Sequence, residues 1–216
     1  MNTQILRKNS ILQNLLLTSK VKAKEQELVY LKNQIHPHFL FNALNTVYGL
    51  ALKNTPETPT IILKLSNLLD YILYQANKPK VLLVSEIEHL EHYIDLEKIR
   101  FNDTLKVTFT KQIENLEAEI APLVLLPFVE NIFKHGGMIN GVLEAIINIS
   151  VTDTVLDFNI KNTFRRKAST GGLGLKNIKE RLDILYPENY YLLIDSNLNW
   201  YEVRLKINHL KHKIYV

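Results

Sequence analysis

The chain has 216 residues, 46% of them apolar, so it can bury one large hydrophobic core or two modest ones, which excludes a disordered protein. It contains no cysteine, which excludes disulfide bonds and thiolate metal sites. The formal net charge of +4 is confined to the start, because residues 1–35 carry six Lys and Arg against two Glu and residues 36–216 carry twenty of each sign. A neutral body argues against direct binding of nucleic acid, which requires a basic face on the folded domain.

The N-terminal segment, residues 1–27, is predicted to be a basic helical linker. Its longest uncharged stretch, residues 9–19, is shorter than the ~20 apolar residues that a membrane helix needs. A basic segment ahead of a cytoplasmic domain is typical of the region that follows a membrane helix, so one hypothesis is a membrane sensor segment N-terminal to this chain. A solvated basic helix is the alternative. We expect a cytoplasmic location for the chain itself.

Residues 28–80 are predicted to form a helical hairpin. A seven-residue apolar repeat through residues 17–35 leads into it and indicates either a dimer seam or an ordinary amphipathic helix. Helical spacing resumes through residues 40–50, stops at the two prolines of residues 53–59, and returns through residues 61–73. Two helices alone make a poor core, so we expect two copies of the hairpin to pair as a four-helix bundle in a homodimer.

The remainder, residues 81–216, changes character. The spacing of Ser85 and Glu88 is that of a capping box and predicts a helix from Ser85 to about Arg100. Alternating apolar residues predict strands at 107–113, 142–151, 156–161 and 201–207, and helical spacing predicts helices at 122–135 and 173–186. This order predicts an α+β fold, in which one mixed sheet is covered on one face by helices as a two-layer α/β sandwich.

Two histidines, His36 and His38, flank a proline inside otherwise helical sequence. They are two positions apart, or about 200° around a helix, so they cannot both ligate one metal ion without breaking the helix. Taken alone, either histidine is more often a plain surface or core residue than a functional group. A role for His38 therefore depends on what accompanies it.

Four polar side chains gather at one end of an apolar helix within residues 126–137: Glu130, Asn131, Lys134 and His135. Asn131 and Lys134 are one turn apart and point the same way, so their carboxamide and ammonium groups can hold a metal-bound triphosphate. The alternative is a simple helix C-terminus with a glycine cap and a cation near the negative end of the helix dipole.

A glycine-rich loop at residues 169–174 opens into a helix. Free amides at a helix start attract phosphate, and glycines let the backbone approach it closely. The loop is neither a Walker loop nor the six-residue dinucleotide fingerprint, so by itself it does not identify a nucleotide site.

Together and in this order, these segments resemble the LytS-like family of sensor histidine kinases, over nearly everything from residue 28 to residue 207. The matching segments are residues 38–42 (the phosphoacceptor box), 96–101 (the link between the two domains), 127–136 (the N box of the histidine-kinase and Hsp90-like ATP-binding fold) and 172–175 (its glycine box). The resemblance implies a dimerisation and histidine-phosphotransfer hairpin at residues 28–80 and an ATP-binding domain at residues 81–216.

The resemblance further implies that Mg-ATP phosphorylates His38 and that the phosphate passes to an aspartate of a response regulator, often one with a LytTR-type DNA-binding domain. The nucleotide-binding residues that it implies are Asn131, Lys134, His135, Asn162, Gly172, Gly174 and Leu175, with Asn131 also binding Mg²⁺. Neutral imidazole is a good nucleophile near pH 7, and phosphoryl transfer mostly needs positioning and charge neutralisation.

Two departures from the wider family matter. Many histidine kinases have an acidic residue directly after the phosphorylated histidine, whereas this chain has Phe39, so the base is unidentified. The superfamily reads adenine with an Asp-x-Gly-x-Gly box, whereas this chain offers Asn162, without the charge and the glycines, and a short lid at residues 165–170 that carries Arg165, Arg166 and Lys167. The alternatives are therefore a dimeric scaffold with a decayed nucleotide site and an Hsp90-like or gyrase-like ATPase.

Overall fold

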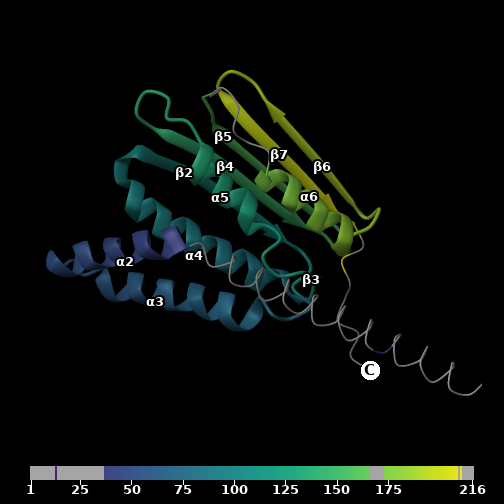
Figure 1. Cartoon of the computed structure of the whole chain (residues 1–216), viewed down its shortest axis with the longest axis horizontal. Helices are drawn as coiled ribbons and strands as arrows, with labels where there is room; N and C mark the ends of the chain where they lie inside the picture. Colours follow the sequence, from purple (N-terminus) through teal and green to yellow (C-terminus); the bar gives the residue numbers. More distant parts are fainter. Residues whose placement is uncertain (1–12, 14–36, 166–172, 209, 211–216) are drawn as a thin grey trace, which may run out of the picture. The chain divides into compact units, whose positions relative to one another are not determined.

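The computed structural model describes residues 13, 37–165, 173–208 and 210, and the predicted repeat at residues 17–35 lies outside them. The chain divides into two compact units, residues 1–41 and residues 42–216. The elements are, in chain order (Figure 1), α2 (Pro37–Leu52), α3 (Thr58–Asp70), η1 (Tyr71–Gln75), β1 (Val81–Leu82), α4 (Leu83–Phe101), η2 (Asn102–Thr104), β2 (Leu105–Ile113), β3 (Glu119–Ile120), α5 (Leu126–His135), β4 (Leu143–Val151), β5 (Leu156–Thr163), α6 (Leu173–Leu185), β6 (Tyr190–Ser196) and β7 (Trp200–Ile207).

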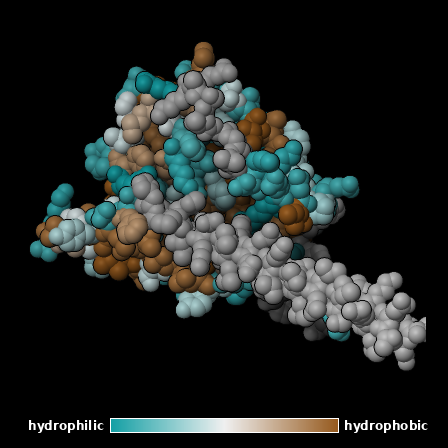
Figure 2. All heavy atoms as spheres, in the orientation of Figure 1, coloured by the Kyte–Doolittle hydropathy of each residue, from teal (hydrophilic) through white to brown (hydrophobic). Residues whose placement is uncertain are grey.

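The helices α2 and α3 are the arms of the predicted hairpin (Figure 1). Asn54, in the left-handed conformation with φ 50°, turns the chain between them, and α3 continues into the π-helical turn η1. Figure 2 shows hydrophobic atoms gathered over this hairpin. Its exposed large apolar side chains are Phe41, Leu44, Tyr48, Leu52, Ile62, Leu63, Leu73 and Tyr74. The hairpin therefore presents an apolar surface that the rest of the described chain leaves uncovered.

The main sheet has the strand order β2-β4-β5-β7-β6, in which β2 and β4 are parallel and the other neighbours are antiparallel. Alternate residues of its three central strands are buried: Leu143, Ala145, Ile147, Ile149, Val151, Leu156, Phe158, Ile160, Val203, Leu205 and Ile207. Phe128 of α5 meets Phe158 of β5 with ring centroids 6.1 Å apart, so the buried face carries the helices. The predicted two-layer α/β sandwich is confirmed.

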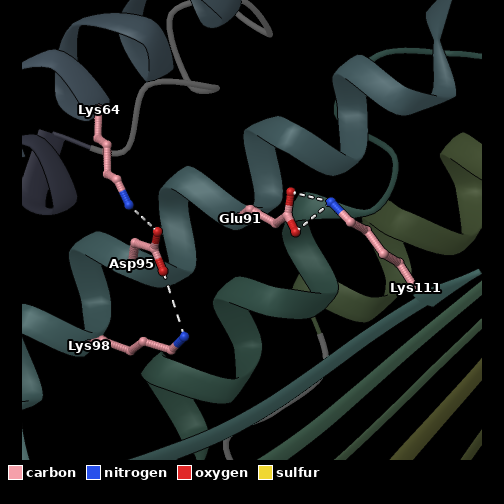
Figure 3. Close-up of polar contacts among 5 residues, drawn as sticks. All are labelled: Lys64, Glu91, Asp95, Lys98 and Lys111. Atoms are coloured by element: carbon pink, nitrogen blue, oxygen red, sulfur yellow. Dashed lines mark hydrogen bonds and ion pairs between the residues drawn. The ribbon is translucent and has the colours of Figure 1, made fainter.

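The helix α4 lies between the hairpin and the sheet, and Figure 3 shows how it is tied to each. Lys64 of α3 forms an ion pair with Asp95, and the Lys111 ammonium of β2 lies 2.7 and 2.8 Å from the two carboxylate oxygens of Glu91. At 19 residues α4 is the longest described helix, and no helix in the described ranges has both the length and the apolarity to cross a membrane.

The predicted start of α4 is wrong by two residues, and the capping box at Ser85 is not formed. Leu82 is the N-cap and makes no side-chain cap bond. The helix starts where it does because β1 pairs with β3 and the Leu83 amide donates to the Ala118 carbonyl at 2.7 Å. A tertiary hydrogen bond therefore satisfies the first amide of the helix in place of a local cap.

The helix predicted for residues 122–135 begins only at Leu126, because Leu123 adopts the left-handed conformation with φ 54° and interrupts the helical spacing. The helix at residues 173–186 and the four predicted strands are confirmed to within two residues at each end. The edge strand β6 was not predicted. Its side chains are half-buried or exposed, so the apolar alternation that reveals a core strand is weak there.

Candidate nucleotide-binding site

The helix α5 carries three of the predicted site residues. Pro127 lies in its first turn, where a missing amide hydrogen costs little, and its apolar face is buried against the sheet. The polar side chains lie away from that face: Asn131 is half-buried, and Lys134 and His135 are exposed. Lys134 and His135 lie in the last turn of α5, at the negative end of the helix dipole.

Two glycines bring the end of α5 against the end of β5. A Cβ atom on Gly136 would overlap the Ile132 carbonyl and lie 2.5 Å from Leu143 Cδ1, and a Cβ on Gly137 would lie 2.9 Å from the carbonyl carbon of Phe164. The Gly137 amide donates to the Thr163 carbonyl at 2.9 Å. Only glycine allows this approach, which is closer than real Cβ contacts permit.

The same approach places Asn162 beside the last turn of α5. Its Nδ2 atom lies 3.4 Å from the position that a Gly136 Cβ would occupy. Asn162 is 3% exposed, and Nδ2 donates to the Thr163 carbonyl at 2.9 Å. Asn131, Lys134 and His135 therefore share one helix. Asn162 lies beside the end of that helix, although it is 27 or more positions later in the chain.

Two of the predicted residues, Gly174 and Leu175, lie in the first turn of α6, whereas Gly172 lies outside the described residues. The other end of α6 is fixed: Arg181 donates to the Leu123 carbonyl at 2.9 Å, and the Ala121 amide donates to the Tyr186 hydroxyl at 2.8 Å. The first turn of α6 therefore lies at the opposite end of the helix from its contacts with the segment that precedes α5.

Lys134 belongs to a group of charges between α4 and α5. Its ammonium donates to the Glu130 carboxylate at 2.9 Å, and Arg100 lies 2.5 Å from the carboxylate of Glu97. Burial raises the pKa of Glu97 to about 7, which Arg100, the hydroxyl of Tyr93 and Lys134 oppose and Glu130 reinforces. This network holds Lys134 against its own helix and makes the protonation of Glu97 sensitive to pH near neutrality.

Two buried carboxylates of α4 were not predicted from the sequence: Glu86 and Glu97, which are 0% and 1% exposed. A signal for them was present. Glu97 follows Leu90 and Ile94 at the spacing of an apolar helical stripe, so a charged residue falls on the face that the helix buries.

His38 is the second residue of α2 and lies in the unit formed by residues 1–41, whereas the other predicted site residues lie in the unit formed by residues 42–216. In the described residues no group of three or more His, Asp or Glu side chains is arranged to hold a metal ion. A magnesium ion that arrives with a nucleotide needs only an oxygen such as that of Asn131 from the protein, because phosphates and water complete its shell. The residues present therefore fit Mg-ATP.

The described chain is thus a helical hairpin followed by a two-layer sandwich, in which α5 carries Asn131 and Lys134 one turn apart. Residues 26–105 match the family described as histidine kinase. The chain is similar to sensor proteins named LytS and HptS. It is 29% identical over 192 residues to the sensor protein LytS of Oceanobacillus iheyensis, a match that covers 80% of this chain and 33% of that protein.

A second relative is the sensor protein kinase HptS of Staphylococcus aureus strain USA300, 31% identical over 115 residues, which covers 53% of this chain and 22% of that protein. Among solved structures, the histidine kinase domain of the blue-light activated histidine kinase from Erythrobacter litoralis aligns with a TM-score of 0.47 at 12% identity, over 79% of this chain and 94% of that chain. The chain thus spans about a third of the length of its LytS relatives.

Proposed function

We propose that the chain is the kinase core of a two-component sensor histidine kinase that transfers the γ-phosphoryl group of Mg-ATP to His38 and then to an aspartate of a response regulator. The observation that carries the proposal is that Asn131 and Lys134 share α5, and that Gly136 at the end of this helix lies beside Asn162 of β5. The match of residues 26–105, which include His38, to the histidine kinase family supports it.

In this proposal Asn131 binds Mg²⁺ through its side-chain oxygen, Lys134 neutralises charge on the phosphates, and His135 lies near the nucleotide. Asn162 contacts adenine, and the first turn of α6, with Gly172, Gly174 and Leu175, offers its free amides to the phosphates. Lys134 exchanges its bond to Glu130 for one to phosphate, which is open to the Lys134 side chain because that side chain is 41% exposed.

The transfer balances as an in-line substitution. An unprotonated ring nitrogen of His38 forms a bond to the γ-phosphorus while the bond from phosphorus to the bridging oxygen of ADP breaks, and Mg-ADP leaves. The ring then carries a proton that must be released. Phe39 cannot accept it, so the accepting group comes from elsewhere in the chain or from water.

The apolar surface of the hairpin supports a homodimer. Tyr48 and Leu52 of α2 are 65% and 68% exposed, and Leu63 of α3 is 60% exposed. Two hairpins that pair as a four-helix bundle bury this surface. We expect Tyr48→Glu to convert a dimer into a monomer in light scattering, whereas Tyr191→Glu, on the edge strand β6, leaves the mass unchanged.

The proposal extends to the surroundings of the chain. The partner is a response regulator, with a LytTR-type DNA-binding domain as the expected output, so DNA contact belongs to the partner. We propose a cytoplasmic location for the chain, and the basic character of residues 1–27 supports the hypothesis of a membrane sensor segment N-terminal to it.

The test is incubation with γ-labelled Mg-ATP, scoring acid-labile, base-stable label on the protein. We expect label on the wild-type chain, and none on His38→Ala or Asn131→Ala. His92→Ala and Asn77→Ala are the matched controls, since they remove the same groups elsewhere in the described chain. Nucleotide binding without label, with ATP turnover undiminished in His38→Ala, would identify an ATPase.

The scaffold remains the second candidate, and one observation favours it. Asn162 replaces the adenine-reading aspartate, and its Nδ2 atom is already bonded to the Thr163 carbonyl. A scaffold binds no Mg-ATP, so calorimetry on the folded dimer separates the two functions.

A further inference from the structure

The turn that precedes α5 is held in a conformation that its sequence disfavours. Leu123 has φ 54° and is 3% exposed, although a leucine in the left-handed region is sterically strained. Its amide donates to Oε2 of Glu86 at 2.9 Å, and its carbonyl accepts from Arg181 at 2.9 Å. Arg181 also donates to the Pro122 carbonyl at 2.6 Å. Side chains from α4 and α6 thus fix both polar groups of one strained residue.

The carboxylate of Glu86 also reaches the hairpin. Glu86 is 0% exposed and accepts from the Leu125 amide at 3.2 Å and from the Tyr71 hydroxyl at 2.5 Å. Tyr71 opens η1, the π-helical turn that ends the hairpin, and such turns often mark functional positions. Burial raises the pKa of Glu86, while the three donors and the positive charge of Arg181 lower it. One buried carboxylate therefore contacts the end of the hairpin and the start of α5.

We propose that Glu86 and Arg181 are positioning residues for the nucleotide site, and that Tyr71 joins the hairpin to the same turn. The proposal rests on the proposed function, because it assumes that the ends of α5 and α6 bind nucleotide. Asn131 and Lys134 lie on the helix that starts three residues after Leu123. The helix that carries Gly174 is fastened to Leu123 by its other half. A change in the conformation of Leu123 therefore displaces α5 and α6 together, the two helices whose ends form the proposed nucleotide site.

The hydrogen bond from the Tyr71 hydroxyl to Glu86 couples the hairpin to the turn at Leu123. The Tyr71 hydroxyl is the contact through which a movement of η1 reaches Leu123 and Leu125, since all three donors share one carboxylate. Coupling of this kind is reciprocal, so nucleotide bound at the far ends of α5 and α6 restrains η1 in turn.

The first measurement is the affinity for a non-hydrolysable Mg-ATP analogue, at a temperature at which circular dichroism shows every variant folded. Glu86→Gln replaces an oxygen that accepts backbone amides with a group that donates, and Arg181→Met keeps the stem but removes the donors. We expect each to weaken binding about tenfold, because small displacements of positioned groups are costly. Ile147→Ala, a core variant whose side chain offers the turn no hydrogen bond, is expected to stay within about twofold despite its loss of stability.

The combined Glu86→Gln, Arg181→Met variant separates positioning from a general loss of stability. If both residues act through Leu123, the loss of affinity in the combined variant is smaller than the product of the single losses. Unchanged affinity in both folded single variants overturns the proposal. Should Glu86→Gln not fold, Arg181→Met and Tyr71→Phe carry the test.

Amide hydrogen exchange measured without nucleotide tests the contacts at Leu123 independently of the proposed function. We expect Glu86→Gln and Tyr71→Phe to accelerate exchange at the Leu123 and Leu125 amides and through α5, while Tyr74→Phe, on the same turn but 66% exposed, does not. A wild-type chain that binds no Mg-ATP analogue refutes the proposed function alone. Exchange at Leu123 and Leu125 that is equal in Tyr71→Phe and wild type refutes the hairpin link.

Discussion

Replacing Glu97 with glutamine is expected to stabilise the protein above neutral pH. Glu97 is 1% exposed, and burial raises the pKa of its carboxyl from 4.5 to about 7. The folded state therefore binds a proton that the unfolded state has released between these two values, so the contribution of Glu97 to stability is present below pH 4.5 and is lost as the pH rises through 7. Glutamine copies the protonated form at every pH.

The magnitude follows from the two pKa values. Each unit of pKa difference corresponds to about 1.4 kcal/mol, so ionised Glu97 costs up to about 3 kcal/mol at pH 8. In a chain of this size that corresponds to a rise in Tm of about 6–12 °C for Glu97→Gln. At pH 4.5 the two proteins are expected to melt within about 2 °C of each other.

The assay is thermal unfolding followed by circular dichroism from pH 4.5 to pH 8.5. Glu91→Gln is the matched control on the same helix, because its carboxylate is 33% exposed and paired with Lys111 at the surface. Such pairs contribute about 0–1 kcal/mol, so this variant is expected to follow the wild type. Curves for Glu97→Gln and wild type that stay parallel across the pH range would refute the reasoning.

Three further outcomes are expected. Gly136→Ala forces a Cβ into the Ile132 carbonyl, so it should reduce the free energy of unfolding by about 1–3 kcal/mol or more and weaken nucleotide binding. Gly49→Ala places its Cβ where nothing lies within 4 Å, so it should stabilise α2 by about 0.5–1 kcal/mol in urea unfolding. His89 is 2% exposed, and burial lowers its pKa to about 3, so the contribution of neutral His89 to the free energy of unfolding is lost as the pH falls below 6.5. Relative to wild type, His89→Phe should therefore gain about 2 kcal/mol in the free energy of unfolding when the pH is lowered from 7 to 5. A stability difference between the two proteins that is the same at pH 5 and pH 7 would contradict this. Lys134→Met should weaken binding of Mg-ATP more than that of adenosine, and equal losses for both ligands would argue against a phosphate contact.

Much of the fold could be predicted from periodicity. The strands at 107–113, 156–161 and 201–207 alternate apolar and polar residues because one face of the sheet is buried and the other is not, and that pattern is local. The edge strand β6 was not predicted because its side chains are only partly buried. The start of α4 was misplaced because a hydrogen bond to Ala118, 35 residues away, replaces the cap that Ser85 and Glu88 suggested.

The sequence by itself determined the order and type of most of the elements, the residues that resemble a phosphoacceptor box and a nucleotide-binding helix, and the absence of cysteine chemistry. Helical spacing alone placed Asn131 and Lys134 on one face. Only the tertiary structure brought Asn162 against Gly136, buried Glu86 and Glu97, and fixed Leu123 in a left-handed turn. These features depend on contacts between segments far apart in the chain, and burial and charge, unlike periodicity, belong to the packed structure and cannot be read from neighbouring residues.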